Sequence, residues 1–135
     1  MIKIVLDTNI LVSSILSEHG SSHKIVEMAI AQIIKNHTSP DILKEFQKVL
    51  REDFKQPEEY VRRQIKLVTS YSDIVHPKER INAVKEDPKD DMILECGMAC
   101  GADYIITGDN HLLKLADFKG IKIIKPADFY LLFSR

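Results

Sequence analysis

At 135 residues, with 44% apolar and 29% charged side chains, the chain has the size and composition of a single globular domain built on one core. It contains no run of about 18 apolar residues, which excludes a membrane-spanning helix within the sequence. The 19 basic and 20 acidic side chains give a net charge of −1, which at first argues against a nucleic-acid partner.

Five short runs rich in β-branched residues predict strands. In chain order they are Ile2 to Leu6, Ile33 to Ile34, Ile74 to Val75, Tyr104 to Thr107 and Ile121 to Ile124, the second and third being the weakest. Segments with helical spacing separate these runs, and this alternation predicts an α/β fold with a largely parallel sheet. The first run has no basic region before it and no cleavage site after it, so we expect no signal peptide and a cytoplasmic protein.

Capping residues and prolines mark five predicted helices. These run from Thr8 to Leu16, from Ser39 to Leu50, from Pro57 to Val68, from Asp87 to Gly101 and from Pro126 to Phe133. A serine, threonine or aspartate beside the first turn accepts its free N–H groups, and proline suits the first position because its missing N–H is not needed there. The mostly charged residues 77–86 are predicted to form a loop or an irregular helix.

The cysteines and histidines show no pattern typical of a zinc or redox site. Cys96 and Cys100 lie four residues apart on a predicted helix, but a zinc site needs more ligands than this segment offers. We interpret both as small buried hydrophobic side chains. The Gly-Ser-Ser between His19 and His23 indicates a loop, so both rings are expected in solvent. None of the histidines is placed to serve as a general base.

Two aspartates directly follow predicted strands. Asp7 ends the run that begins at Ile2, and Asp109 stands just beyond Thr107. In open α/β sheets, ligands bind outside the carboxyl ends of the strands, so both carboxylates are expected at one edge. Each could instead be a helix cap or a turn residue. For Asp7 this alternative is weaker because Thr8 can do the capping.

Glu45 lies at the margin of an amphipathic helix. The apolar stripe of that helix passes three residues before Glu45, at Ile42, and four residues after it, at Val49, so the carboxylate points partly toward the core. An ionised acid buried without a partner costs several kcal/mol, so Glu45 must stay at the rim, pair with a base or ligate a metal. The structural alternative is a rim glutamate paired with Lys44 or Lys48.

Three acids compete for one position in the segment 87–91. Asp90 stands three residues before Ile93, so it continues the helix face expected to pack inward. Asp91 is rotated by about 100° from Asp90, toward solvent. Asp87 is best explained as the helix N-cap, and an acid at Asp90 would also favour the helix dipole.

Together, Asp7, Glu45, Asp90 and Asp109 predict a cation site. Two unit charges about 4 Å apart repel by roughly 4 kcal/mol at an effective dielectric of about 20, so clustered carboxylates need protonation or a bound ion. Ligation by oxygen alone, without histidine or thiolate, favours Mg²⁺ or Mn²⁺ and points to phosphate-ester chemistry. Setting these four acids aside leaves 19 basic against 16 acidic side chains, or +3, which permits a polyanionic substrate.

The motifs that carry these acids resemble a PIN domain. They are Asp7-Thr8-Asn9 after the first strand, Glu45 within a mid-chain helix, Asp87-Pro88-Lys89-Asp90 at a helix start, and Thr107-Gly108-Asp109 followed by His111-Leu112-Leu113. The resemblance covers essentially the whole chain and implies one Rossmann-like α/β/α sandwich over residues 1–135. It also implies a Mg²⁺- or Mn²⁺-dependent endoribonuclease of the kind found as the toxin of prokaryotic toxin-antitoxin pairs.

By the same resemblance, the four acids form a catalytic and metal-binding quartet supported by Asn9 and Thr107. Asp91 remains open as an alternative third acid. The implied partners are RNA, a small antitoxin and a second copy of the chain. Four basic residues near the rim are candidates for RNA contacts, although each could be only a solvated helix charge: Lys44, Lys48, Arg51 and Lys114.

Two other classes of protein compete with this interpretation. A non-catalytic RNA-binding domain of the same fold would be expected to lose at least one of the acids. A phosphoryl-transfer domain of the haloacid-dehalogenase type would need an aspartate at position 9, where Asn9 stands. A response regulator would need a phosphate-accepting aspartate after a mid-chain strand, and none is evident. The apolar run from Phe129 to Phe133 is expected in the core rather than at an interface.

Overall fold

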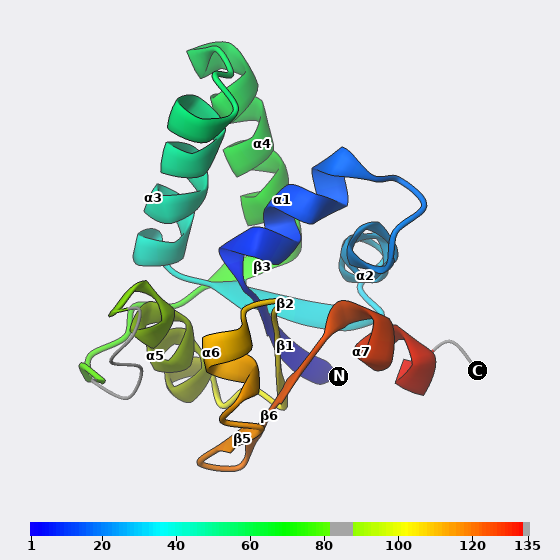
Figure 1. Cartoon of the computed structure of the whole chain (residues 1–135), viewed down its shortest axis with the longest axis vertical. Helices are drawn as coiled ribbons and strands as arrows, with labels where there is room; N and C mark the ends of the chain where they lie inside the picture. The colour runs from blue at the N-terminus through cyan, green and yellow to red at the C-terminus, as the bar shows by residue number, and fades with distance from the viewer. Residues whose placement is uncertain (82–87, 134–135) are drawn as a thin grey trace.

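The computed structural model describes residues 1–81 and 88–133 and contains one six-stranded sheet (Figure 1). The strand order is β3-β2-β1-β4-β6-β5, and all neighbours are parallel except β5 and β6. The strands are β1 (Ile2–Leu6), β2 (Ile34–Thr38), β3 (Ser72–Ile74), β4 (Tyr104–Ile106), β5 (Asp117–Phe118) and β6 (Ile121–Ile124). The prediction of a largely parallel α/β sheet is confirmed.

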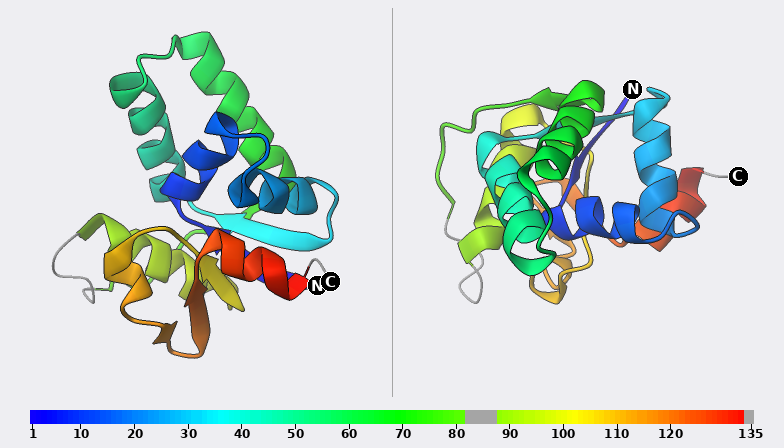
Figure 2. Two further views of the ribbon diagram at one scale, coloured as in Figure 1. Left: turned by 45° about the vertical axis from the view of Figure 1, so that its right-hand side comes forward. Right: turned by 90° about the horizontal axis from the view of Figure 1, so that it is seen from above.

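Helices cover both faces of this sheet. They are α1 (Thr8–Leu16), α2 (Ser21–Ile30), α3 (Pro40–Lys48), α4 (Glu58–Tyr71), α5 (Asp91–Cys100), α6 (Asn110–Leu113) and α7 (Pro126–Phe133). A π-helical turn, Val49–Asp53, extends α3, and a 3₁₀ turn, Pro88–Asp90, precedes α5. In Figures 1 and 2, α1, α2 and α4 lie on one side of the sheet and α5 on the other. This is the three-layer sandwich expected from the sequence.

The central strand β1 is the middle of the core. Ile4, Val5 and Leu6 are fully buried because parallel strands covered on both faces meet no solvent. On the α5 side, a Cβ atom at Gly97 would lie 3.0 Å from Cδ1 of Ile105, so glycine allows this helix to approach the sheet closely. The helix ends at Gly101, as predicted, and the φ of +67° at this residue is one that glycine adopts without strain.

Most predicted helix starts are confirmed, with one correction at the first. Ser39 caps α3 by accepting the Ile42 N–H at 3.3 Å, and Pro57 precedes α4. The N-cap of α1 is Asp7 rather than Thr8, although the Asp7 side chain makes no capping hydrogen bond. The prediction that Thr8 caps this helix is therefore wrong. The predicted cap Asp87 and residues 82–86 lie outside the described residues.

Two segments predicted from composition have a different structure. Gly20 to Ser22, expected as a loop, begins α2, so His23 is a helical residue whose Nδ1 lies 3.0 Å from the Ser14 carbonyl oxygen. It is therefore only partly exposed. Strand β2 runs to Thr38 and is largely polar. It can be buried because the Asn36 side chain accepts the Leu6 N–H at 3.1 Å and donates to Ser72 Oγ at 2.8 Å. A polar residue with such partners fits a buried strand.

The C-terminal run is only partly in the core. Phe129 is fully buried and packs edge to face against Tyr104, with ring centroids 5.3 Å apart. Leu131 and Leu132 are exposed, at 61% and 53%, so the prediction of a core segment is wrong for them. No helix in the two described stretches has both the length and the apolar composition needed to cross a membrane.

The cap at Ser39 can be tested because α3 is the helix that carries Glu45. Ser39→Ala removes the acceptor for the Ile42 N–H and should lower the free energy of unfolding by about 1 kcal/mol. The melting temperature should fall by roughly 3 to 5 °C in differential scanning calorimetry. Ser70→Ala, at an exposed position of α4, is the control and should cause little change. Equal melting temperatures for Ser39→Ala and the wild type would contradict this role.

Candidate functional site at the carboxyl edge of the sheet

The strand order reverses direction between β1 and β4. The chain proceeds from β1 to β2 and β3 on one side, and β4 and β6 lie on the other side of β1. A crevice opens at the carboxyl ends of two such strands, where open α/β sheets bind ligands. Asp7 directly follows β1, and Thr107 and Asp109 follow β4. The topology therefore brings these three residues to one crevice, as the sequence positions of the two aspartates predicted.

Thr107 connects the two strand ends by hydrogen bonds. Its hydroxyl donates to Asp7 Oδ2 at 2.7 Å and accepts the Asp109 N–H at 2.9 Å. Asn9 adds a second connection, since its side-chain amide donates to Asp7 Oδ2 at 3.3 Å and its Oδ1 accepts the Gly108 N–H at 3.2 Å. Thr107 is fully buried and Asp7 is 5% exposed, so the first of these bonds is shielded from water. Thr107 and Asn9 thus fix the orientation of the Asp7 carboxylate.

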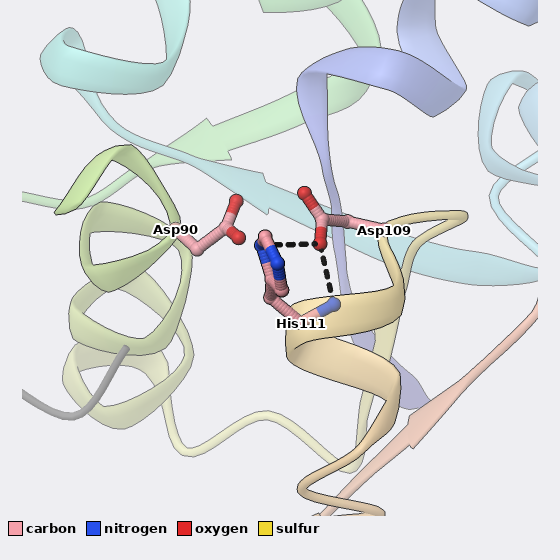
Figure 3. Close-up of side chains that lie close together, drawn as sticks. All are labelled: Asp90, Asp109 and His111. Atoms are coloured by element: carbon pink, nitrogen blue, oxygen red, sulfur yellow. Dashed lines mark hydrogen bonds and ion pairs between the residues drawn. The ribbon is translucent and has the colours of Figure 1, made fainter. Parts of the chain in front are cut away.

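Asp90, Asp109 and His111 form a compact group on the α5 side of the crevice (Figure 3). One ligand atom from each lies within 4.8 Å of the others. Asp109 caps α6 by accepting the His111 N–H at 2.7 Å, and the His111 ring Nδ1 lies 3.7 Å from the same Oδ1. His111 thus lies beside the acids, where the sequence predicted a ligand set of oxygen atoms alone, without histidine.

Glu45 lies at the side of a groove of about 330 Å³ that Asp7 and Asp90 also line. Its side chain is 19% exposed and pairs with Lys89 at 3.4 Å. The base that pairs with Glu45 is thus Lys89, rather than Lys44 or Lys48 on its own helix. Three of the four predicted acids share this groove, and Asp90 belongs both to it and to the group with Asp109.

Two acids on α5 are buried although the sequence did not predict it. Asp91 is 6% exposed, so the expectation that it faces solvent is wrong. Glu95 is also 6% exposed, and its carboxylate accepts the Ile81 N–H at 2.9 Å and pairs with Arg80 at 3.2 Å. Such a carboxylate has a structural explanation. Only its position on the inward face of α5, four residues after Asp91, could have indicated its burial.

The remaining predicted residues lie outside this group. Lys44 and Lys48 are exposed on α3, and Lys114 is exposed at the end of α6. The Arg51 guanidinium donates to both carboxylate oxygens of Glu58 on α4, which restrains it. Cys96 is fully buried, and burial raises the pKa of the Cys100 thiol to about 11, as expected of apolar rather than reactive cysteines.

The donors in the crevice fit a divalent cation. Asp90 and Asp109 offer carboxylate oxygens, and His111 offers an imidazole nitrogen. The buried Thr8 Oγ1 lines the same groove as Asp90 and has no hydrogen-bond partner among the residues that the structure describes. A polar atom of this kind is satisfied by a ligand or by ordered water. The site is thus chemically suited to hold a hydrated metal ion.

Comparison with known proteins gives consistent matches. A family model described as PIN domain matches residues 3–111, which include all four acids and His111. The uncharacterized protein MJ1680 of Methanocaldococcus jannaschii is 32% identical over 120 residues, covering 86% of this chain and 76% of that protein.

Two solved structures share the fold. VapBC2 from Rickettsia felis, bound to a DNA fragment from their promoter, has a TM-score of 0.61 at 18% identity, covering 90% of this chain and 97% of that chain. PAE2754 from Pyrobaculum aerophilum has a TM-score of 0.60 at 14% identity, and the match covers 99% of this chain and 91% of that chain. At these identities the likeness concerns the fold.

The Thr107 hydroxyl can be tested by an isosteric pair of substitutions. Thr107→Val keeps the shape but leaves the partly buried Asp109 N–H and the buried Asp7 carboxylate without this partner, which should lower the free energy of unfolding by about 1 to 3 kcal/mol. Thr107→Ser keeps the hydroxyl and should lose less. Urea denaturation of the three proteins measures the difference. If valine and serine had the same effect, the hydrogen bonds would not be what stabilises this junction.

Proposed function

The chain belongs to the PIN-domain family, and from that premise we propose that it is a Mg²⁺- or Mn²⁺-dependent endoribonuclease. The observation that carries the proposal is the convergence of acids from different elements on one crevice. Asp7 and Asp109 follow the two strands at the switch point, and Asp90 lies beside Asp109. Members of this family are generally nucleases, so such acids are suited to phosphodiester hydrolysis.

The proposed catalytic and metal-binding set is Asp7, Glu45, Asp90 and Asp109. A divalent ion bound there would lower the pKa of a bound water and neutralise charge on the scissile phosphate. Glu45 pairs with Lys89 in the free protein, so it would exchange an ammonium partner for the ion. Asp109, whose Oδ1 already accepts the His111 N–H, would hold or orient the attacking water through its other oxygen.

Supporting residues would keep the acids in position. Thr107 and Asn9 both donate to Oδ2 of Asp7, which leaves the orientation of that carboxylate fixed before any ion binds. A pre-oriented ligand loses less conformational entropy on binding. Both residues belong to motifs that the sequence singled out, and their proposed role is positioning rather than contact with RNA.

RNA would be held by basic side chains around the groove. Lys44, Lys48 and Lys114 are exposed and able to meet phosphates, whereas Arg51 would first have to leave Glu58. We expect the lysines to contribute mainly through charge, which makes binding weaker at higher salt. A net charge of −1 that becomes +3 without the four site acids is compatible with this role.

A toxin role, in a pair with a small antitoxin, is our proposal for the biological context. It is supported by the fold shared with VapBC2 from Rickettsia felis, whose crystal structure was determined with a bound DNA fragment from the VapBC2 promoter. We further propose that residues 1–135 act as one nuclease domain in the cytoplasm and form a homodimer. The non-catalytic alternative is less favoured because such a domain has no need to retain a full set of acids.

The catalytic proposal predicts that Asp7→Asn abolishes cleavage. The amide keeps an oxygen for the Thr107 hydroxyl but removes the charge, so we expect at least about a 100-fold loss. The assay is cleavage of labelled single-stranded RNA with Mg²⁺ or Mn²⁺, with EDTA as the metal-free sample.

Asp128→Asn, at an exposed position of α7, is the matched control and should cleave like the wild type. Cleavage that survives EDTA, or equal rates for Asp7→Asn and the wild type, would contradict the metal-dependent mechanism. RNA binding without cleavage by the wild type would favour the non-catalytic alternative.

The roles of Asp90 and Asp91 can be distinguished by changing each in turn to asparagine and measuring RNA cleavage. Even residues that only hydrogen-bond a metal ligand are worth about 10- to 100-fold in activity or affinity, so Asp90→Asn should reduce cleavage by about 100-fold or more. Asp91→Asn should reduce it much less, because Asp90, not Asp91, lies within reach of Asp109 and His111. Calorimetric titration of Mn²⁺ should give the same order. A larger loss in Asp91→Asn would exchange the two roles.

A further inference from the structure

We propose that His111 supplies a nitrogen ligand to the metal site and thereby makes it prefer Mn²⁺ over Mg²⁺. The inference rests on the proposed function, because it concerns the ion of that same site. It replaces the expectation of an oxygen-only ligand set. The observation behind it is the group of Asp90, Asp109 and His111, whose ligand atoms lie within 4.8 Å of one another.

The distances suit a shared ion. Ligands bound to one ion at about 2.1 Å lie at most about 4.2 Å apart. Nδ1 of His111 and Oδ1 of Asp109 are 3.7 Å apart, so they already satisfy this limit. The widest separation in the group can reach 4.8 Å, and small rotations of the side chains would close the difference. Figure 3 shows the Asp90 carboxylate directed from the start of α5 toward Asp109, with the His111 ring between them.

A simpler role for the ring, as a hydrogen-bond partner of Asp109, fits less well. The distance of 3.7 Å is beyond a hydrogen bond. Oδ1 of Asp109 instead accepts the His111 backbone N–H at 2.7 Å, so the backbone already orients this carboxylate. The ring side chain is 41% exposed, which leaves it accessible to an ion from solvent.

The backbone around His111 is held in place. Leu112 is fully buried, and the Leu113 N–H donates to the Asp109 carbonyl oxygen at 2.9 Å, which closes the turn of α6. The histidine side chain therefore projects from an anchored turn rather than from a free loop. An anchored imidazole loses little freedom when it binds an ion.

Ligand chemistry gives the direction of the preference. Mg²⁺ takes oxygen ligands and keeps several of its waters, whereas imidazole binds transition metals well. Carboxylates accept either ion. An added imidazole should therefore strengthen Mn²⁺ binding and change Mg²⁺ binding little, which makes His111 a determinant of metal specificity.

The test measures Mn²⁺ binding to the whole protein directly. The concentration of free Mn²⁺ is quantified from its electron paramagnetic resonance signal, and the Mg²⁺ affinity is determined from competition of Mg²⁺ with Mn²⁺ for the site. His111→Gln keeps the backbone N–H to Asp109 and offers at most an oxygen ligand. We expect it to weaken Mn²⁺ binding by roughly tenfold and Mg²⁺ binding by less than about twofold. His19→Gln, at an exposed position, is the matched control and should match the wild type.

A second readout identifies the ligand atom. Pulsed electron paramagnetic resonance of Mn²⁺ bound to the wild type should show a ¹⁴N coupling from imidazole that is absent in His111→Gln and kept in His19→Gln. Thermal unfolding of the ion-free proteins checks that both variants are folded. Unchanged Mn²⁺ affinity in His111→Gln, or no ¹⁴N coupling in the wild type, would overturn the inference.

The two proposals fail in different ways. If the wild type cleaves RNA with Mn²⁺ but shows no ¹⁴N coupling, the proposed function stands and His111 is not a ligand. If Mn²⁺ binds with the coupling but RNA is not cleaved, His111 is a ligand and the proposed function is wrong.

Discussion

Mutual repulsion of carboxylates at the carboxyl edge of the sheet is the constraint on which the site depends. Asp90 and Asp109 present ligand atoms within 4.8 Å of each other, where two unit charges repel by about 3 to 4 kcal/mol at an effective dielectric of 20. A fold is only about 5 to 15 kcal/mol stable, so such repulsion is a large cost. The His111 N–H stabilises the Asp109 carboxylate, Thr107 and Asn9 donate to Asp7, and Lys89 pairs with Glu45, so part of the negative charge at this edge is compensated. A bound cation would remove the rest.

The parts of the fold that depend on local pattern were predictable. The runs rich in β-branched residues at Ile2 and Ile121 matched β1 and β6 at both ends, because such side chains favour strands. Once β1 and β4 are parallel neighbours, the residues after them must meet at one edge, and this placed Asp7 beside Thr107. Asp90 is buried, as predicted, although it lies in the 3₁₀ turn before α5 rather than on the helix itself.

Features that depend on contacts between distant segments were not predictable. Strand β2 is largely polar, and only the partners of Asn36 across the sheet explain why such a sequence is buried. Asp91 was expected in solvent from its angle on α5, yet it is buried. His111 lies on a helix of four residues, which is too short for a periodic signal, and only the fold brings it near Asp90, which is far away in the sequence. The metal-binding role of the site acids and the RNA-binding role of the basic residues remain predictions.

A crystal structure of the protein grown with Mn²⁺, with data collected to record anomalous scattering from manganese, would show directly whether the site binds a cation. We predict an anomalous peak in the crevice between β1 and β4, within ligand distance of Asp90 and Asp109 and close to Asp7. Such a peak would show that the gathered carboxylates serve to bind a cation. A fully ordered crevice without a peak at millimolar Mn²⁺, or a peak only at other acids, would contradict this claim.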